Sequence, residues 1–160
     1  MQVDDVSVSD LDEVLALNEA SVPHVNSLSL SELQWFHEHA PYFRLVRSDG
    51  RIAGFLIGLG SGLDYGSPNY QYFCARHEVF GYVDRVAVLP DAQRLGIASR
   101  LYEDYAATLR GFAPVMKCEV YLRPSNPGSL AYHERHGFKR VATQETEGGS
   151  KEVALMEKRL

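Results

Sequence analysis

The stretch from Tyr82 to Tyr105 constrains the fold most, because it reads as a strand that runs directly into a helix. Its first half carries β-branched residues at Val83, Val86 and Val88, which favour an extended backbone. Pro90 ends this strand, since proline cannot donate a hydrogen bond to a neighbouring strand and favours a turn. We therefore predict a strand, a short loop and a helix in direct succession. The helix is indicated by apolar residues at helical spacing, at Ala98, Leu101, Tyr102, Tyr105 and Leu109.

The loop that joins the two halves, Gln93 to Ala98, has the features of an anion-binding site. The first amides of a helix have no intrahelical acceptor, and the helix dipole adds partial positive charge at the same end. Gly96 and Ala98 carry little or no side chain, so a phosphate can approach the backbone closely. Arg94 adds a positive charge. We therefore predict a phosphate site here, which a nucleotide would fit as well.

Size and composition indicate a single globular domain over residues 1–160. The net charge of −5 and the lack of long basic runs argue against a nucleic-acid partner. Cys74 and Cys118 are isolated, which indicates a reducing compartment and gives no metal spacing. The sequence shows no signal peptide and no apolar run near the ~20 residues of a membrane span. We therefore expect a cytoplasmic protein without membrane association.

The rest of the chain predicts further strands and helices on both sides of this unit. A short strand at Val3 to Val8 and two helices are expected before Pro41, the second opened by a capping box at Ser29–Glu32. Asp49-Gly50 between apolar runs predicts a hairpin, and a second hairpin is expected near the C-terminus. We predict an α/β fold: a mixed, mostly antiparallel sheet of about six to seven strands with flanking helices and a central βαβ unit.

The connection from Gly60 to Val79 is predicted to be functional, because loops longer than ~12–15 residues in compact domains usually are. Its aromatic content argues against disorder. These side chains either line an acceptor pocket or fill gaps in the packing, and the sequence leaves both uses open. They are Tyr65, Tyr70, Tyr72, Phe73 and Phe80.

Two motifs resemble the GNAT superfamily of N-acetyltransferases. The run Gln93–Ala98, QRLGIA, fits the pattern Q/R-x-x-G-x-G/A. The run Asn126–Phe138 resembles the superfamily's C-terminal motif, in which an asparagine is followed by a small residue, an aromatic residue, a glutamate and a Gly-Phe pair. The strand Tyr82–Arg85, YVDR, is also similar to a bacterial branch of this superfamily. Two motifs in the expected order and context are far more specific than either one alone.

The resemblance implies acetyl-coenzyme A as cosubstrate, held at the splayed edge of the central strand of a GNAT-like fold. Its pantetheine arm would pair with the strand backbone like an added strand, and its pyrophosphate would bind amides of the following loop. An asparagine and a serine of the next loop would also touch it. The implied cofactor-binding residues are Val86, Ala87, Val88, Gln93, Arg94, Leu95, Gly96, Ile97, Ala98, Ser99, Asn126 and Ser129.

Acyl transfer to an amine needs a base, an oxyanion donor and an acid for the leaving thiolate. We expect Asp84 as the base, acting through water, with the alternative that it pairs with a nearby arginine and holds the substrate loop. The Val88 amide is the simplest oxyanion donor. His133 stands where the superfamily usually has a tyrosine acid, so it either donates a proton or is a solvated or capping residue. His133 and His136 lack a third ligand, and no metal is expected.

The main functional prediction is an N-acetyltransferase that transfers an acetyl group directly to a primary amine of a small molecule or amino acid. A peptide or protein amine stays open as acceptor. A non-catalytic module that senses acyl-coenzyme A is the second hypothesis, and a nucleotide-phosphate binder is a third. A homodimer is one option for the assembly, with Lys151 to Met156 as the candidate edge of the sheet.

Overall fold

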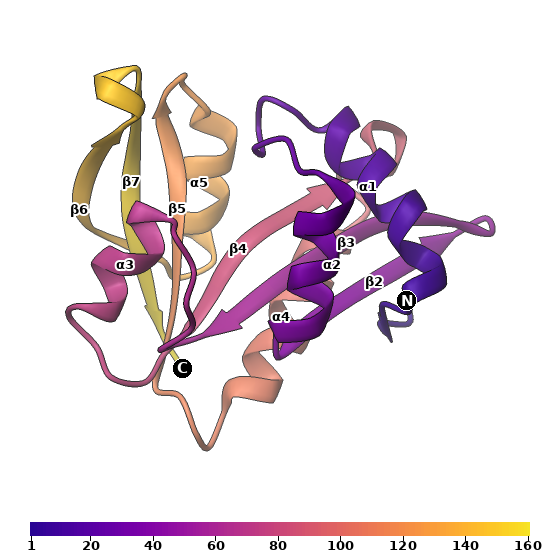
Figure 1. Ribbon diagram of the computed structural model, residues 1–160, viewed down its shortest axis with the longest axis horizontal. Coiled ribbons are helices and arrows are strands. Elements are labelled where there is room, and N and C mark those ends of the chain that lie inside the picture. The colour runs from indigo at the N-terminus through magenta and orange to yellow at the C-terminus, as the bar shows by residue number, and fades with distance from the viewer. The chain divides into compact units, whose positions relative to one another are not determined.

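Seven strands form the sheet of the computed structural model, which describes residues 1–160 (Figure 1). Their order is β1-β2-β3-β4-β5-β7-β6. The strands are β1 (Asp4–Asp5), β2 (Tyr42–Ser48), β3 (Arg51–Gly60), β4 (Gly81–Val88), β5 (Val115–Arg123), β6 (Lys139–Thr146) and β7 (Lys151–Arg159). The helices are α1 (Leu11–Ala20), α2 (Leu30–His39), α3 (Pro68–Cys74), α4 (Ile97–Leu109) and α5 (Pro127–Arg135).

The pairing of the strands confirms the predicted fold class. β4 and β5 are parallel and α4 connects them, which is the expected βαβ unit. The pairs β1–β2, β2–β3, β5–β7 and β6–β7 are antiparallel. The molecule is thus an α/β protein with a mixed, mostly antiparallel sheet.

The chain groups into two compact units. The first unit comprises residues Met1–Leu59 and Val83–Thr108, and the second comprises Gly60–Tyr82 and Leu109–Leu160. Strand β4 contributes residues to both. That residues 1–160 fold as one domain stays a prediction.

In the first unit, α1 and α2 lie on one face of β2 and β3, and α4 lies on the other (Figure 1). Two glycines of β3 let α4 approach closely. A Cβ atom at Gly58 would collide with the Tyr105 ring, and one at Gly54 would lie 2.7 Å from Ile97 Cγ2. Because real Cβ contacts are never this short, these glycines set the depth at which α4 packs. They thereby fix the N-terminal end of α4 relative to the sheet.

Local signals read from the sequence are confirmed in the first unit. The β2–β3 hairpin turns through Asp49 (φ 53°) and Gly50 (φ 77°), the left-handed pair that a two-residue hairpin needs. Helix α2 has its capping box, since the Glu32 amide donates to Ser29 Oγ and the Ser29 amide donates to Glu32 Oε1, both at 3.1 Å. Turn and cap residues therefore specify these two features.

In the second unit, α3 is a helix that the sequence did not predict inside the long connection. Ser67 caps it and Pro68 takes its first position, a common helix start. Tyr70, Phe73 and Phe80 of this region are each 1% exposed, and the Tyr70 ring packs edge-on to Tyr82 at 5.3 Å between centroids. These three aromatic residues fill the packing between α3 and the strands. The pocket interpretation is wrong for them.

Two expectations about strands need correction. The first strand is only Asp4–Asp5, because the Ser7 amide bonds the Asp10 carboxylate and Val8 begins a short 3₁₀ turn. Strand β7, which contains Lys151 to Met156, is not an edge, because it lies between β5 and β6. The four consecutive buried residues Val153–Met156 are typical of a strand covered on both faces, whereas β6 is largely exposed. No helix is long and apolar enough to cross a membrane.

Candidate active site

The turn before α4 has the open geometry that an anion site requires. Arg94 (φ 66°) and Gly96 (φ 81°) both take left-handed backbone angles. A Cβ atom built at Gly96 would meet no atom within 4 Å, so the backbone is open on that side. The Arg100 amide donates to the Gly96 carbonyl at 2.9 Å, and the amides of Ile97 and Ala98 precede that first helical bond. The turn thus leaves the backbone at Gly96 open on one side, next to the N-terminal amides of α4.

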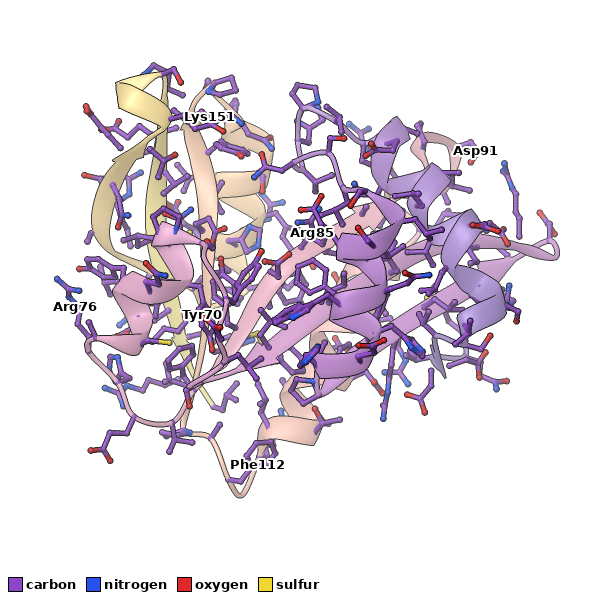
Figure 2. All side chains as sticks on the ribbon, in the orientation of Figure 1. Tyr70, Arg76, Arg85, Asp91, Phe112 and Lys151 are labelled. Atoms are coloured by element: carbon purple, nitrogen blue, oxygen red, sulfur yellow. The ribbon has the colours of Figure 1, made fainter.

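Hydrogen bonds on the strand side hold this turn in place. The Leu89 amide donates to the Ala53 carbonyl of β3 at 2.8 Å, and the Ala92 amide donates to the Leu89 carbonyl at 2.9 Å. Ala92 and Ile97 are buried, whereas Leu95 between them is exposed. The Asp91 carboxylate pairs with Arg51 at the surface (Figure 2). Both ends of the open turn are therefore anchored on the first unit.

Strand β4 carries the predicted base in a buried ion pair. Val83, Arg85 and Ala87 are buried, and the alternate residues are partly exposed. Arg85 Nε donates to Asp84 Oδ2 at 2.8 Å, and the Asp84 side chain is only 4% exposed. Since the residue as a whole is partly exposed, the accessible surface at Asp84 belongs to its backbone. The structure thus contains the pairing with a nearby arginine that was the alternative expectation for Asp84.

The arginine of this pair reaches into the helical layer. In Figure 2, Arg85 points from β4 toward α2, and its guanidinium lies 5.5 Å from the centre of the Phe36 ring. Its Nη1 donates to Asn18 Oδ1 at 3.0 Å. Asn18 is fully buried in α1, although its side chain is polar. A polar residue in an apolar stripe was the available signal for this contact.

In the second unit, the predicted contacts Asn126 and Ser129 lie together at the start of α5. Asn126 is the N-cap, and its Oδ1 accepts a 3.4 Å hydrogen bond from the Ser129 amide. Pro127 takes the first helical position. Helix capping by itself therefore explains the presence of Asn126 and Ser129 at these positions. Their contact with a cofactor stays a prediction.

His133 is held by the same helix. Its Nδ1 lies 2.7 Å from the Ser129 carbonyl, which can only accept, so Nδ1 carries the proton and Nε2 carries the lone pair. Burial lowers the pKa of His133 below its usual 6.5, against the opposing effect of this hydrogen bond. The imidazole is therefore neutral at pH 7. In this tautomer Nε2 accepts a hydrogen bond, and donation from it requires prior protonation.

Two pairs of residues that the sequence analysis did not identify lie in the second unit. The Tyr82 hydroxyl donates to Glu119 Oε2 of β5 at 2.5 Å. Lys117, also on β5, is 1% exposed, pairs with Glu157 and lies 5.2 Å from the centre of the Phe73 ring. The signal was the charge at alternate positions of β5. On the other face of β5, Cys118 is buried, and burial raises the pKa of its thiol, so it is no nucleophile.

Comparison with known proteins now decides the family. The model of the acetyltransferase (GNAT) family matches residues 11–138. The chain belongs to the GNAT family of acetyltransferases. It is therefore an acyltransferase of a family that uses acyl-coenzyme A, and the resemblance noted in the two motifs is confirmed.

Solved GNAT structures share the fold over nearly the whole chain. The ribosomal-protein-S18-alanine N-acetyltransferase from Escherichia coli aligns with a TM-score of 0.74 at 18% identity, over 99% of this chain and 92% of that one. An N-acetyltransferase from Staphylococcus aureus aligns at 0.71 and 22% identity, over 99% and 97%. The NatB acetyltransferase complex bound to a bisubstrate inhibitor aligns at 0.76 and 16%, over 100% and 90%. No curated protein sequence matches significantly.

Proposed function

We propose that this GNAT protein transfers an acetyl group from acetyl-coenzyme A directly to a primary amine of a small molecule or amino acid. The observation that carries the proposal is the open turn at the start of α4, with Gly96 in a left-handed conformation and no atom near its Cβ position. A phosphate ester needs this combination of exposed amides and absent side chains. The family match supplies the reaction class.

The first unit offers a fitting surface for the cosubstrate. Backbone groups of Val86, Ala87 and Val88 are proposed to hold the pantetheine arm, and Val86 and Val88 are partly exposed as this requires. Amides from Gln93 to Ser99 are proposed to hold the pyrophosphate. In the second unit, Asn126 and Ser129 stay the proposed contacts. When bound, acetyl-coenzyme A supplies the activated acyl group as a thioester.

Asp84 is proposed to take the proton of the acceptor amine through water. An amine with a pKa near ~10 is mostly protonated at neutral pH and must lose its proton to attack. The Arg85 guanidinium holds Oδ2 of the carboxylate, which fixes its orientation. The Val88 amide is the proposed donor to the oxyanion.

His133 is proposed to donate a proton to the thiolate of coenzyme A as it leaves. Its lowered pKa makes the imidazolium scarce at neutral pH, so this route becomes slower as pH rises. If His133 serves as acid, replacing it with phenylalanine lowers turnover most at the acid end of the pH range. Equal loss at every pH would instead indicate a packing role for the ring.

The class of acceptor is the least constrained part of the proposal. Two of the similar structures are ribosomal-protein-alanine N-acetyltransferases, from Escherichia coli and Brucella melitensis. A peptide α-amine is therefore the alternative acceptor that the test must include.

The test is release of free thiol from acetyl-coenzyme A by the purified protein, with a panel of free amino acids, aliphatic diamines, amino sugars and short peptides with free N-termini. We expect amine-dependent thiol release and a product that is heavier by one acetyl group. Tight binding of acetyl-coenzyme A without release for any amine would support the sensing module instead. Calorimetry that finds ATP bound more tightly than acetyl-coenzyme A would support a nucleotide binder.

A further inference from the structure

One guanidinium connects the proposed base to the segment between α1 and α2. Besides its bonds to Asp84 and Asn18, Arg85 donates from Nη1 to the carbonyl of Asn26 at 2.9 Å. The buried amide of Asn18 donates to the same carbonyl at 3.1 Å. Asp84 and the Asn26 carbonyl are therefore both bonded to the Arg85 side chain, from two of its nitrogen atoms.

The same segment, residues 21–29, is fastened from a second side by Glu19. The Leu28 amide donates to Glu19 Oε2 at 3.3 Å, and the Ser27 hydroxyl donates to Oε1. The hydrogen bond from Ser27, followed by that from Asn18, holds the pKa of Glu19 below its usual 4.5, so it accepts as a carboxylate. Three consecutive residues, 26–28, are thus held through backbone or side-chain bonds.

The residues before this fastened part face outward. Residues 22–24 are exposed, and Val22 is 42% exposed although it is apolar. The His24 amide donates to the Ser21 carbonyl at 2.9 Å, which makes a compact turn. The segment 21–29 therefore exposes a short turn at residues 22–24, and its Asn26 carbonyl is hydrogen-bonded to Arg85, the neighbour of Asp84 in the chain.

We infer that Arg85 is a positioning residue for the acyl acceptor, which fixes the segment 21–29 relative to the Asp84 carboxylate so that the acceptor amine meets both in one arrangement. The inference rests on the proposed function, in which Asp84 takes the proton. Arginine suits this role because its planar fork holds two acceptors in fixed directions, whereas a lysine ammonium is a single flexible point. The buried pair is expensive to desolvate, so its presence is better explained by orientation than by stability.

The experiment compares Arg85→Met, Arg85→Lys and Asn18→Ala with wild type. Asn18→Ala removes three hydrogen bonds of the network, to Arg85, Asn26 and Glu19, but leaves the Asp84–Arg85 pair, so it serves where Arg85→Met does not fold. Arg44→Met is the control, because Arg44 is another ion-paired arginine of the first unit, with Asp5 and Asp104 as its partners. Two readouts are taken on the full chain: amide hydrogen exchange of residues 21–29 without ligand, and KM values for acetyl-coenzyme A and for the best amine of the panel.

We expect Arg85→Met to raise the KM for the amine by about tenfold or more, the value of one charge-assisted hydrogen bond, with an unchanged KM for acetyl-coenzyme A. Arg85→Lys recovers part of this loss, Asn18→Ala shows a smaller loss of the same kind, and exchange of residues 21–29 accelerates in all three. Arg44→Met changes none of these. Unchanged exchange of the segment, or a loss of active protein with both KM values intact, would overturn the inference. If the wild-type protein is inactive toward every amine, the proposed function is contradicted. Hydrogen exchange in the variants then still shows whether Arg85 fixes the segment 21–29.

Discussion

Gly96 is the residue on which the phosphate site depends. It combines a φ of 81°, which side-chain-bearing residues rarely adopt, with open space around its Cβ position. The first property concerns backbone strain and the second concerns access for a ligand. A test at this residue must separate the two.

Gly96→Glu is expected to abolish binding of acetyl-coenzyme A, because it places bulk and negative charge at the amides that would hold the pyrophosphate. Gly62→Glu is the matched control for cofactor binding, since Gly62 has a φ of 82° and equally open surroundings outside the proposed phosphate site. Both variants should lose about 1 kcal/mol of stability through strain, but only the first should lose binding in a calorimetric titration. Retained affinity in Gly96→Glu would remove the phosphate site.

The pKa of His133 makes a second prediction at this scale. Because burial lowers this pKa below 6.5 in the folded state, the unfolded state binds more protons just below pH 6.5. The contribution of His133 to the free energy of unfolding is thus complete above pH 6.5 and declines as pH falls through the window between 6.5 and the lowered value. His133→Gln should flatten this slope in urea unfolding at a series of pH values. An identical slope in His133→Gln would show that the ring titrates normally.

The residues of the candidate site differ in how far sequence could predict them. Gly96 was identified because its neighbours in the chain define the motif. The partners of Arg85 lie 67 and 59 residues away in the sequence, at Asn18 and Asn26, and no local pattern connects them. The Tyr82–Glu119 bond likewise joins residues 37 apart. Local geometry is readable from a single sequence, whereas contacts made by folding are not.

At the scale of elements, some helix ends could be predicted from the sequence and others could not. The capping box at Ser29 was predicted because serine and glutamate at fixed spacing have a defined geometry. At the start of α1, Ser9 does not cap the helix, and the Asp10 carboxylate accepts hydrogen bonds from the amide and hydroxyl of Ser7. Helix α3, of only seven residues, is too short to show a periodic stripe.

Ser29→Ala should therefore destabilise the protein by about 1 kcal/mol, because the Glu32 amide loses its acceptor. Ser9→Ala, at the serine that does not cap a helix, should be nearly neutral. Urea unfolding of the two variants distinguishes them. Equal losses would mean that Ser9 stabilises the start of α1 as strongly as Ser29 stabilises the start of α2.

At the scale of the whole molecule, acid stability depends on the ion pair of β5 and β7. The hydrogen bond from Lys117 holds the pKa of Glu157 below its usual 4.5. A lowered carboxyl pKa contributes stability that is complete above 4.5 and is lost as pH falls through the folded value. The pair ties the two strands of the second unit at the position of a nearly fully buried lysine.

Glu157→Gln should cost about 3 kcal/mol at neutral pH, because it leaves the Lys117 ammonium buried without its carboxylate. The difference from wild type should shrink as pH falls below 4.5. Glu152→Gln is the control, since its partner Arg123 is 3.9 Å away and exposed. If the loss of stability caused by Glu157→Gln stays constant as the pH is lowered, the pKa of Glu157 does not differ between the folded and unfolded states, which would contradict this account.

The central claim is that this chain moves an acetyl group from acetyl-coenzyme A to a primary amine. The most direct measurement counts free thiol and acetylated amine in one reaction, by thiol titration and mass spectrometry, with initial rates taken at varied concentrations of both substrates. We predict one acetylated amine for each thiol released and intersecting reciprocal plots, as direct transfer in a ternary complex requires. Thiol release that does not depend on the amine, or none with any amine of the panel, would contradict it.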